Sequence, residues 1–155
     1  MSGKMEPDKR AMNPRQKIRC IKKDLFMANN KIRVLLADDH QVLRKGLAKL
    51  LHEQPDMQVI GEAGDGLSVV ELARLLKPDV VVMDLGLPQA SGYEATRKIV
   101  SENPNICVIG LSAHDNEEFA AEMRKAGAVD YLTKEEPPER LIAAIHACEK
   151  SKGPI

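Results

Sequence analysis

The sequence has no tryptophan, and its 155 residues include only two phenylalanines and two tyrosines. Proteins that bind single-stranded nucleic acid stack bases on aromatic rings, so this scarcity argues against that function. Long apolar runs are also absent, because stretches such as Val80–Met83 are far shorter than the about 18 residues of a membrane span. The first thirty residues lack the apolar segment that a secretory signal requires. These absences predict a cytoplasmic protein without membrane insertion.

Cysteine is scarce as well. Cys20, Cys107 and Cys148 are an odd number of distant thiols, which fits neither a disulfide framework nor a Cys-x-x-Cys metal pair. We therefore expect these cysteines to be reduced.

The histidines do not fall at metal-ligand spacing either, so we expect each of them to be solvated or bonded locally. They are His40, His52, His114 and His146.

Charge is distributed unevenly along the chain, although the formal net charge is zero. Residues 1–31 hold nine Lys and Arg residues against three Asp and Glu residues, whereas residues 32–155 hold 14 against 20. Nucleic-acid affinity comes mostly from phosphate neutralisation by Lys and Arg. The acidic body of the chain therefore argues against direct nucleic-acid binding by that part.

The basic segment over residues 1–30 is interpreted as an extension, and we expect it to be disordered. One alternative is a basic amphipathic helix that touches a membrane surface or an acidic partner, because Ile18, Ile21 and Leu25 recur at helical spacing. Another alternative is a start codon assigned too early, since the segment from Met27 to Lys31 directly precedes the first predicted strand.

From residue 31 to residue 150, short β-branched runs alternate with amphipathic stretches, and we interpret this region as one domain. The predicted strands are residues 32–37, 57–63, 80–83, 106–111 and 129–132, and the predicted helices lie around residues 43–53, 69–76, 92–102, 119–126 and 141–148. Five such units predict an α/β fold, (βα)5, with a doubly wound parallel sheet and helices on both faces.

Polar residues stand where these predicted strands end, which is where such sheets bind ligands. Asp38 and Asp39 follow the first strand, Asp84 the third, Ser112 the fourth, and Lys134 lies just past the fifth. Converging carboxylates suit Mg²⁺, and a lysine and a hydroxyl beside them suit phosphoryl oxygens. Asp84 is then a candidate nucleophile, because carboxylates form aspartyl-phosphates. Taken alone, Asp38 and Asp39 are also compatible with capping a helix.

Five spaced segments resemble the receiver domain of two-component response regulators. They are Asp38-Asp39, the residues 84–88 (DLGLP), Gly92, the residues 111–113 (LSA) and the residues 131–134 (YLTK). The local sequences of residues 34–47 (VLLADDHQVLRKGL) and residues 110–115 (GLSAHD) are most similar to those of the LuxR-type, NarL/FixJ-like branch. The similarity covers residues 31–150 and implies a flavodoxin-like, five-stranded parallel sheet of order 2-1-3-4-5.

This resemblance implies a role for each matching position. Asp84 would accept a phosphoryl group from the phosphohistidine of a histidine kinase. Mg²⁺ would be held by Asp38, Asp39, the Asp84 carboxylate and the backbone carbonyl of Gly86. Lys134 would pair with the phosphoryl oxygens.

The resemblance also implies a conformational switch made of Ser112 and Tyr131. The Ser112 hydroxyl would move to the phosphoryl group, and the Tyr131 ring would change its exposure in response. Plain half-buried packing of Tyr131 is equally compatible with the sequence. New charge at Asp84 would thus change the partner affinity of the surface formed by the fourth helix, fifth strand and fifth helix of the (βα)5 fold.

Two departures from the family pattern stand out. Glu135 follows Lys134 where many receivers have proline, which removes the usual cis-peptide expectation and adds an acid near the site. LuxR-type regulators normally continue into a helix-turn-helix domain, whereas this sequence ends at Ile155. We interpret residues 151–155 as a tail or linker remnant, and we expect output through protein contacts rather than direct nucleic-acid binding.

The implied function is a Mg²⁺-dependent phosphoacceptor that catalyses its own phosphorylation and dephosphorylation, with no turnover of an external metabolite. The implied partners are a sensor histidine kinase or phosphotransfer protein, then a downstream protein, a homologous regulator or a second copy in a homodimer. The alternative is a phosphorylation-independent module that pairs with or competes against a full-length regulator. An aspartyl-phosphate phosphohydrolase would need a second Asp two residues after Asp84, where this sequence has Gly86.

Overall fold

The structure is a computed structural model that describes residues 8–151, with the side chains of residues 23–29 left out of the description. Residues 1–7 of the expected extension and residues 152–155 of the expected tail lie outside this range. The chain divides after Lys31 into two units, and each unit is described by itself.

The N-terminal unit contains the short 3₁₀ helix η1 (Lys9–Ala11) and the helix α1 (Pro14–Asn29). This helix differs from the disordered extension that we expected. Its first turn carries a reciprocal cap, because the Gln16 N–H donates to Asn13 Oδ1 at 2.9 Å and the Asn13 N–H donates to Gln16 Oε1 at 3.0 Å. Pro14 at the first helical position has no N–H to leave unpaired.

The three apolar residues whose spacing suggested a helix, Ile18, Ile21 and Leu25, all lie in α1. Ile18 and Ile21 are exposed by 52% and 57%, while the side chain of Leu25 is outside the description. Within residues 8–151, no helix is long and apolar enough to cross a membrane.

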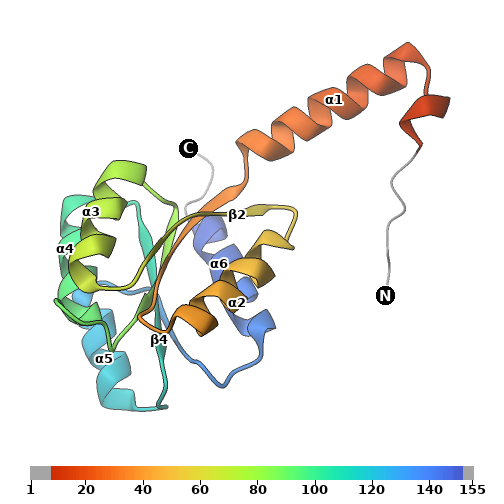
Figure 1. The fold of residues 1–155 in the computed structure, drawn as a ribbon. Helices are drawn as coiled ribbons and strands as arrows, with labels where there is room; N and C mark the ends of the chain where they lie inside the picture. The colour runs from red at the N-terminus through yellow and green to blue at the C-terminus, as the bar shows by residue number, and fades with distance from the viewer. Residues whose placement is uncertain (1–7, 152–155) are drawn as a thin grey trace. The chain divides into compact units, whose positions relative to one another are not determined.

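The second unit is built from five strand–helix pairs, and Figure 1 shows their arrangement. Its strands are parallel and lie in the order β2-β1-β3-β4-β5, which confirms the predicted fold and strand order. The elements are β1 (Ile32–Ala37), α2 (Gln41–His52), β2 (Met57–Ala63), α3 (Gly66–Leu76), β3 (Val80–Asp84), α4 (Gly92–Glu102), β4 (Cys107–Ser112), α5 (Glu117–Ala126), β5 (Asp130–Thr133) and α6 (Pro138–Ser151).

Three strands differ by one residue from the sequence prediction, β3 at its end and β4 and β5 at both ends. β3 includes Asp84, β4 includes Ser112, and β5 runs over Asp130–Thr133. The hydrogen-bond ladder explains the extension, because Asp84 pairs with Leu111 and Ser112 pairs with Thr133. Backbone pairing thus continues past the apolar residues, and it fixes both polar side chains on the rigid ends of strands.

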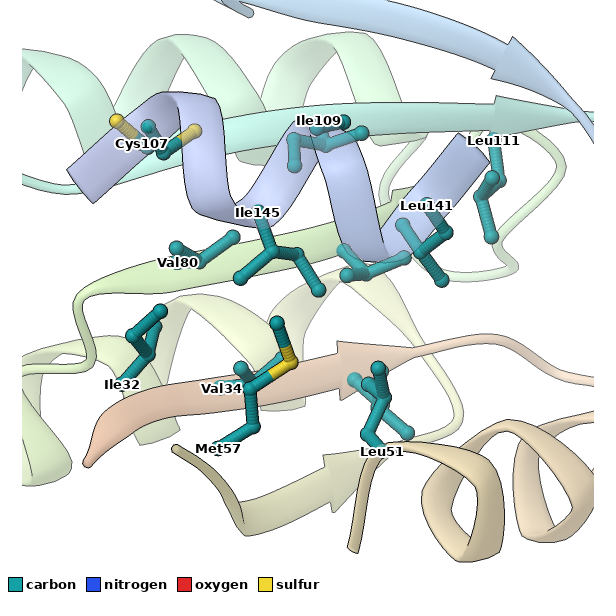
Figure 2. Packing of buried hydrophobic residues seen from close by; sticks show 14 of the residues in the cluster. Ile32, Val34, Leu51, Met57, Val80, Cys107, Ile109, Leu111, Leu141 and Ile145 are labelled. Atoms are coloured by element: carbon teal, nitrogen blue, oxygen red, sulfur yellow. The ribbon is translucent and has the colours of Figure 1, made fainter. Parts of the chain in front are cut away.

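Two apolar clusters cover the two faces of the sheet. One contains Leu51 of α2 and Ile145 of α6, and Figure 2 shows these side chains packed together with Val34 and Val80 of the sheet. The other contains residues of α3, α4 and α5, including Val69, Ile99 and Met123. The near-continuous apolar runs in β1, β3 and β4 follow from burial on both faces.

All five strands of this unit run in the same direction. Their C-terminal ends lie together and carry Asp38, Asp84 and Ser112. β1 begins and α6 finishes at the opposite, N-terminal end of the sheet, because each helix runs back against its preceding strand (Figure 1). The candidate functional residues therefore lie at the end of the unit away from Ile32 and Ser151.

A close backbone approach positions the loop between β3 and α4. A Cβ added at Gly92 would lie 2.4 Å from the Asp84 carbonyl oxygen and 2.9 Å from the Leu85 Cα. The Gly92 N–H also donates to the Leu85 carbonyl at 3.3 Å. Only glycine allows the start of α4 to lie this close to the end of β3.

We expect the substitution Gly92→Ala to lower the free energy of unfolding by about 1–3 kcal/mol, because backbone atoms must move to admit the methyl group. Urea denaturation followed by circular dichroism measures this change. The matched control is Gly46→Ala in α2, where a Cβ meets nothing within 4 Å. That control should gain about 0.5–1 kcal/mol from the higher helix propensity of alanine. Equal effects of the two substitutions would contradict the close approach at Gly92.

Candidate functional site

Asp38 and Asp84 lie side by side at the ends of β1 and β3, which are neighbours in the sheet. Both residues are buried, with only 3% and 4% of their surface exposed. Asp39 is exposed. Asp38, Asp39, His40 and Asp84 each offer a ligand atom, and these atoms lie within 4.8 Å of one another. The structure therefore brings together the three carboxylates that the sequence predicted, and it adds an imidazole.

His40 holds the Asp38 carboxylate from one side. Its backbone N–H donates to Asp38 Oδ1 at 2.8 Å, and its ring Nδ1 lies 3.1 Å from the same oxygen. The same ring atom lies 3.2 Å from Asp39 Oδ1. His40 was expected to be solvated or locally bonded, and its local bonds are to two candidate metal ligands. Its place directly after the two aspartates was the available sequence signal.

Lys134 approaches the same pair of carboxylates from β5. Its backbone N–H donates to the Ser112 carbonyl at 2.7 Å, which extends the pairing of β4 and β5. Its Nζ lies 3.0 Å from Asp38 Oδ2 and 3.3 Å from Asp84 Oδ2, and the side chain is only 12% exposed. One ammonium thus faces two buried carboxylates, so the charges at the centre of the site do not balance.

Burial and neighbouring groups move the two carboxyl pKa values in opposite directions. Burial raises the pKa of Asp38, but the His40 N–H and the Lys134 ammonium outweigh it, and the net pKa is lowered. Burial also raises the pKa of Asp84, and the Asp38 charge raises it further. The Gly86 N–H and Lys134 oppose this shift without cancelling it, so the pKa of Asp84 lies above its ordinary value.

The donor set fits a hard divalent cation. Asp38 Oδ2 and Asp84 Oδ2 are buried oxygens that face the same Lys134 ammonium, at 3.0 Å and 3.3 Å. Two buried carboxylates that share one ammonium leave negative charge uncompensated, and a divalent cation with oxygen ligands offsets this cost. The Gly86 N–H donates to Asp84 Oδ1 at 3.2 Å, while the predicted ligand role of the Gly86 carbonyl stays a prediction.

Ser112 and Tyr131 are joined through the backbone of a single residue, His114. The Ser112 Oγ accepts from the His114 N–H at 3.1 Å, and the Tyr131 O–H donates to the His114 carbonyl at 2.9 Å. Ser112 is buried at the end of β4, whereas Tyr131 is half-buried in β5. The two predicted switch residues are therefore linked by the loop that follows β4.

A cavity of about 360 Å³ opens beside Asp84, and its wall contains Ser112 and Lys134. The half-buried Tyr93 and the 38% exposed Phe119 form its aromatic side. Burial raises the pKa of the Tyr93 hydroxyl, and the neighbouring Tyr131 and Glu122 raise it further. Sequence reasoning missed both residues, because Phe119 was used only as an apolar position of a predicted helix and Tyr93 was not singled out.

Glu135, the acid that replaces proline after Lys134, is exposed. The neighbouring Glu136 is the acid that bonds locally, because its carboxylate accepts from the Thr133 N–H at 2.9 Å. No peptide bond among the described residues is cis.

Comparison with known proteins gives consistent matches. The family model for the response regulator receiver domain matches residues 34–146. The uncharacterized transcriptional regulatory protein YxjL of Bacillus subtilis is 45% identical over 127 residues, which cover 82% of this chain and 58% of that protein. DegU of Brevibacillus brevis is 39% identical over 75% of this chain and 49% of its own length. The chain thus spans about half the length of these curated relatives.

Solved structures are similar over the same region. The signal receiver domain of a NarL response regulator from Mycobacterium tuberculosis superposes with a TM-score of 0.75 at 30% identity, covering 78% of this chain and 98% of that chain. A LuxR-family two-component response regulator from an Aurantimonas species gives a TM-score of 0.73 at 38% identity, covering 76% and 84%. The family model, which matches residues 34–146, includes the candidate site.

We expect the substitution Asp84→Asn to stabilise the metal-free fold at pH 7. Since the pKa of Asp84 is raised in the folded state, its ionisation costs folding free energy as the pH rises above the unfolded pKa. Removing this charge should raise the thermal midpoint by about 2–4 °C, or about 1 kcal/mol for a chain of this size. The difference should shrink as the pH falls below the raised pKa of Asp84, because the folded protein then no longer carries this charge.

Thermal denaturation with and without Mg²⁺ measures both effects. Mg²⁺ should raise the midpoint of the unsubstituted protein and raise that of Asp84→Asn much less, because binding to the folded state stabilises it. The control Asp115→Asn removes an exposed carboxylate and should stay within about 0.5 kcal/mol of the parent. A lower midpoint for Asp84→Asn at pH 7 would contradict the unfavourable charge at this position.

Proposed function

This chain belongs to the response regulator receiver family, and from that premise we propose that Asp84 accepts a phosphoryl group from a sensor histidine kinase or a phosphotransfer protein. Receiver domains bind Mg²⁺ at an acidic pocket, and this chain has a cluster of aspartates at the corresponding strand ends. The proposal rests on Asp84, a buried carboxylate whose Oδ2 lies 3.3 Å from the Lys134 ammonium.

The proposed reaction is an in-line displacement at phosphorus. An Asp84 carboxylate oxygen attacks, the O–P bond forms, and the P–N bond to the donor imidazole breaks as the imidazole leaves with the bonding electron pair. The Gly86 N–H donates to Asp84 Oδ1, and Asp84 lines the cavity together with Ser112 and Lys134. Lys134 then pairs with the phosphoryl oxygens, because its Nζ already lies beside Oδ2.

Asp38, Asp39, Asp84 and the Gly86 carbonyl are the proposed ligands of Mg²⁺. When bound, Mg²⁺ supplies positive charge that balances the carboxylates and the phosphoryl oxygens. Lys134 alone cannot balance them, since it faces two buried carboxylates before the phosphoryl group arrives. This deficit of positive charge supports a cation at the site.

Ser112 and Tyr131 form the proposed switch. The Ser112 hydroxyl must leave the His114 N–H to reach a phosphoryl group on Asp84, and that movement changes the loop whose carbonyl holds the Tyr131 hydroxyl. The output surface is then the region of α5, β5 and α6, because Tyr131 lies on β5. The proposed readers of this surface are a downstream protein, a homologous regulator or a second copy of the chain, in the cytoplasm.

Incubation with acetyl phosphate tests phosphate acceptance directly. Intact mass should rise by about 80 Da, the mass of one phosphoryl group, only when Mg²⁺ is present. Asp84→Asn should show no gain, whereas the exposed-carboxylate control Asp115→Asn should gain as the parent does. A folded parent protein that gains no mass would instead favour the phosphorylation-independent module that pairs with another regulator.

The substitution Ser112→Ala tests the switch. Phosphorylation should change the chemical shifts of the Tyr131 ring much less in this variant than in the parent. The reason is that the variant has no hydroxyl at position 112 that could move to the phosphoryl group and displace the loop. NMR spectra before and after acetyl phosphate treatment measure this shift, and Tyr93→Phe assigns the two tyrosines. The control Ser101→Ala removes a hydroxyl that bonds only locally, to the Lys98 carbonyl in α4. A full Tyr131 shift in phosphorylated Ser112→Ala would contradict the proposed coupling.

A further inference from the structure

The imidazole of His40 has an orientation that helix capping does not explain. His40 is the N-cap residue of α2, but its side chain accepts no hydrogen bond from the first turn. The ring turns to the carboxylates instead, with Nδ1 at 3.1 Å from Asp38 Oδ1 and at 3.2 Å from Asp39 Oδ1. A ring nitrogen therefore lies between two oxygens of the proposed metal site.

The spacing of these atoms matches that of ligands around one ion. With metal–ligand bonds of about 2.0–2.2 Å, neighbouring ligands lie about 3 Å apart and opposite ligands about 4 Å apart. The His40 nitrogen is at such neighbouring distances from two oxygens, and the whole group with Asp84 lies within 4.8 Å. Little rearrangement is needed for Nδ1 to bind an ion together with the carboxylates.

A second observation points to a cation at this position. Asp38 and Asp84 are only 3% and 4% exposed, and their Oδ2 atoms face one and the same ammonium. Lys134 supplies one positive charge to both. The cluster thus has buried oxygens in need of a cation and an adjacent nitrogen that Mg²⁺ does not require.

Ligand type decides which cations use that nitrogen. Mg²⁺ prefers oxygen ligands and keeps several waters, whereas imidazole suits Zn²⁺ and other first-row transition metals. We propose that His40 is a nitrogen ligand that makes the acidic site of this chain a transition-metal site as well. This inference rests on the proposed receiver function, because it places the ion on the same carboxylates, Asp84 included. Such an ion then competes with Mg²⁺ for the phosphoacceptor.

Calorimetric titration of the full chain with Mg²⁺, Mn²⁺ and Zn²⁺ tests the ligand role of His40. His40→Phe keeps an aromatic ring but removes the nitrogen, and His40→Asn guards against a folding defect of the first variant. In both, the dissociation constant for Zn²⁺ should rise about tenfold or more, while that for Mg²⁺ should change less than about threefold. The control His52→Phe alters another exposed histidine of α2 and should leave all three constants unchanged.

Pulsed electron paramagnetic resonance of the Mn²⁺-loaded protein gives a direct readout of the bond. Modulation from an imidazole ¹⁴N should be present in the parent and in His52→Phe, and absent in His40→Phe. Unchanged Zn²⁺ affinity in both His40 variants, an equal loss of Mg²⁺ affinity, or persistent ¹⁴N modulation would each overturn the proposal.

Failure of this inference is distinguishable from failure of the receiver function. Phosphorylation of the unsubstituted protein with acetyl phosphate and Mg²⁺ tests Asp84 without reference to His40. If the parent protein is phosphorylated but the His40 substitutions leave the Zn²⁺ dissociation constant unchanged, only the ligand role of His40 is refuted. A parent protein that binds Zn²⁺ through His40 but accepts no phosphate would refute the phosphoacceptor role alone.

Discussion

Two buried carboxylates share one ammonium, and this imbalance of charge governs the site. Asp38 and Asp84 lie at the ends of neighbouring strands, and Lys134 reaches the Oδ2 atoms of both. Burial raises both pKa values, but the His40 N–H and Lys134 bring the pKa of Asp38 below its ordinary value, whereas burial and the Asp38 charge keep the pKa of Asp84 above it. A fold usually avoids buried like charges, so their presence here is a cost that binding a cation or transferring a charged group can offset.

The backbone around the carboxylates keeps this costly arrangement in place. Parallel pairing of β1, β3, β4 and β5 brings the ends of strands that are far apart in sequence to one edge. Asp84 is itself part of the ladder, opposite Leu111, so it cannot swing away from Asp38 without breaking strand pairing. Gly92 lets α4 begin against the end of β3, which closes the other side. The rigidity of the sheet thus stabilises what electrostatics alone would separate.

The strand–helix alternation and the polar strand ends were readable from the sequence, because periodicity and burial on both faces leave clear patterns. Asp38, Asp39, Asp84, Ser112 and Lys134 were predicted together for that reason. The contacts that depend on side-chain rotamers were not readable, as the His40 ring between two carboxylates and the Tyr131 bond to a carbonyl show. The helix over Pro14–Asn29 was weighed only as an alternative to a disordered extension, although its capping signal, Asn13 with Gln16, was present in the sequence.

The position of the first and last described residues of the second unit relative to Asp84 has a consequence for modular use of this fold. Ile32 and Ser151 lie at the edge of the sheet opposite the carboxylates, one strand length away, about 16 Å for the five residues of β3. A module fused at either end therefore begins on the far side from the chemistry. The state of Asp84 reaches such a module either through the packed core or by a linker long enough to fold back around the domain.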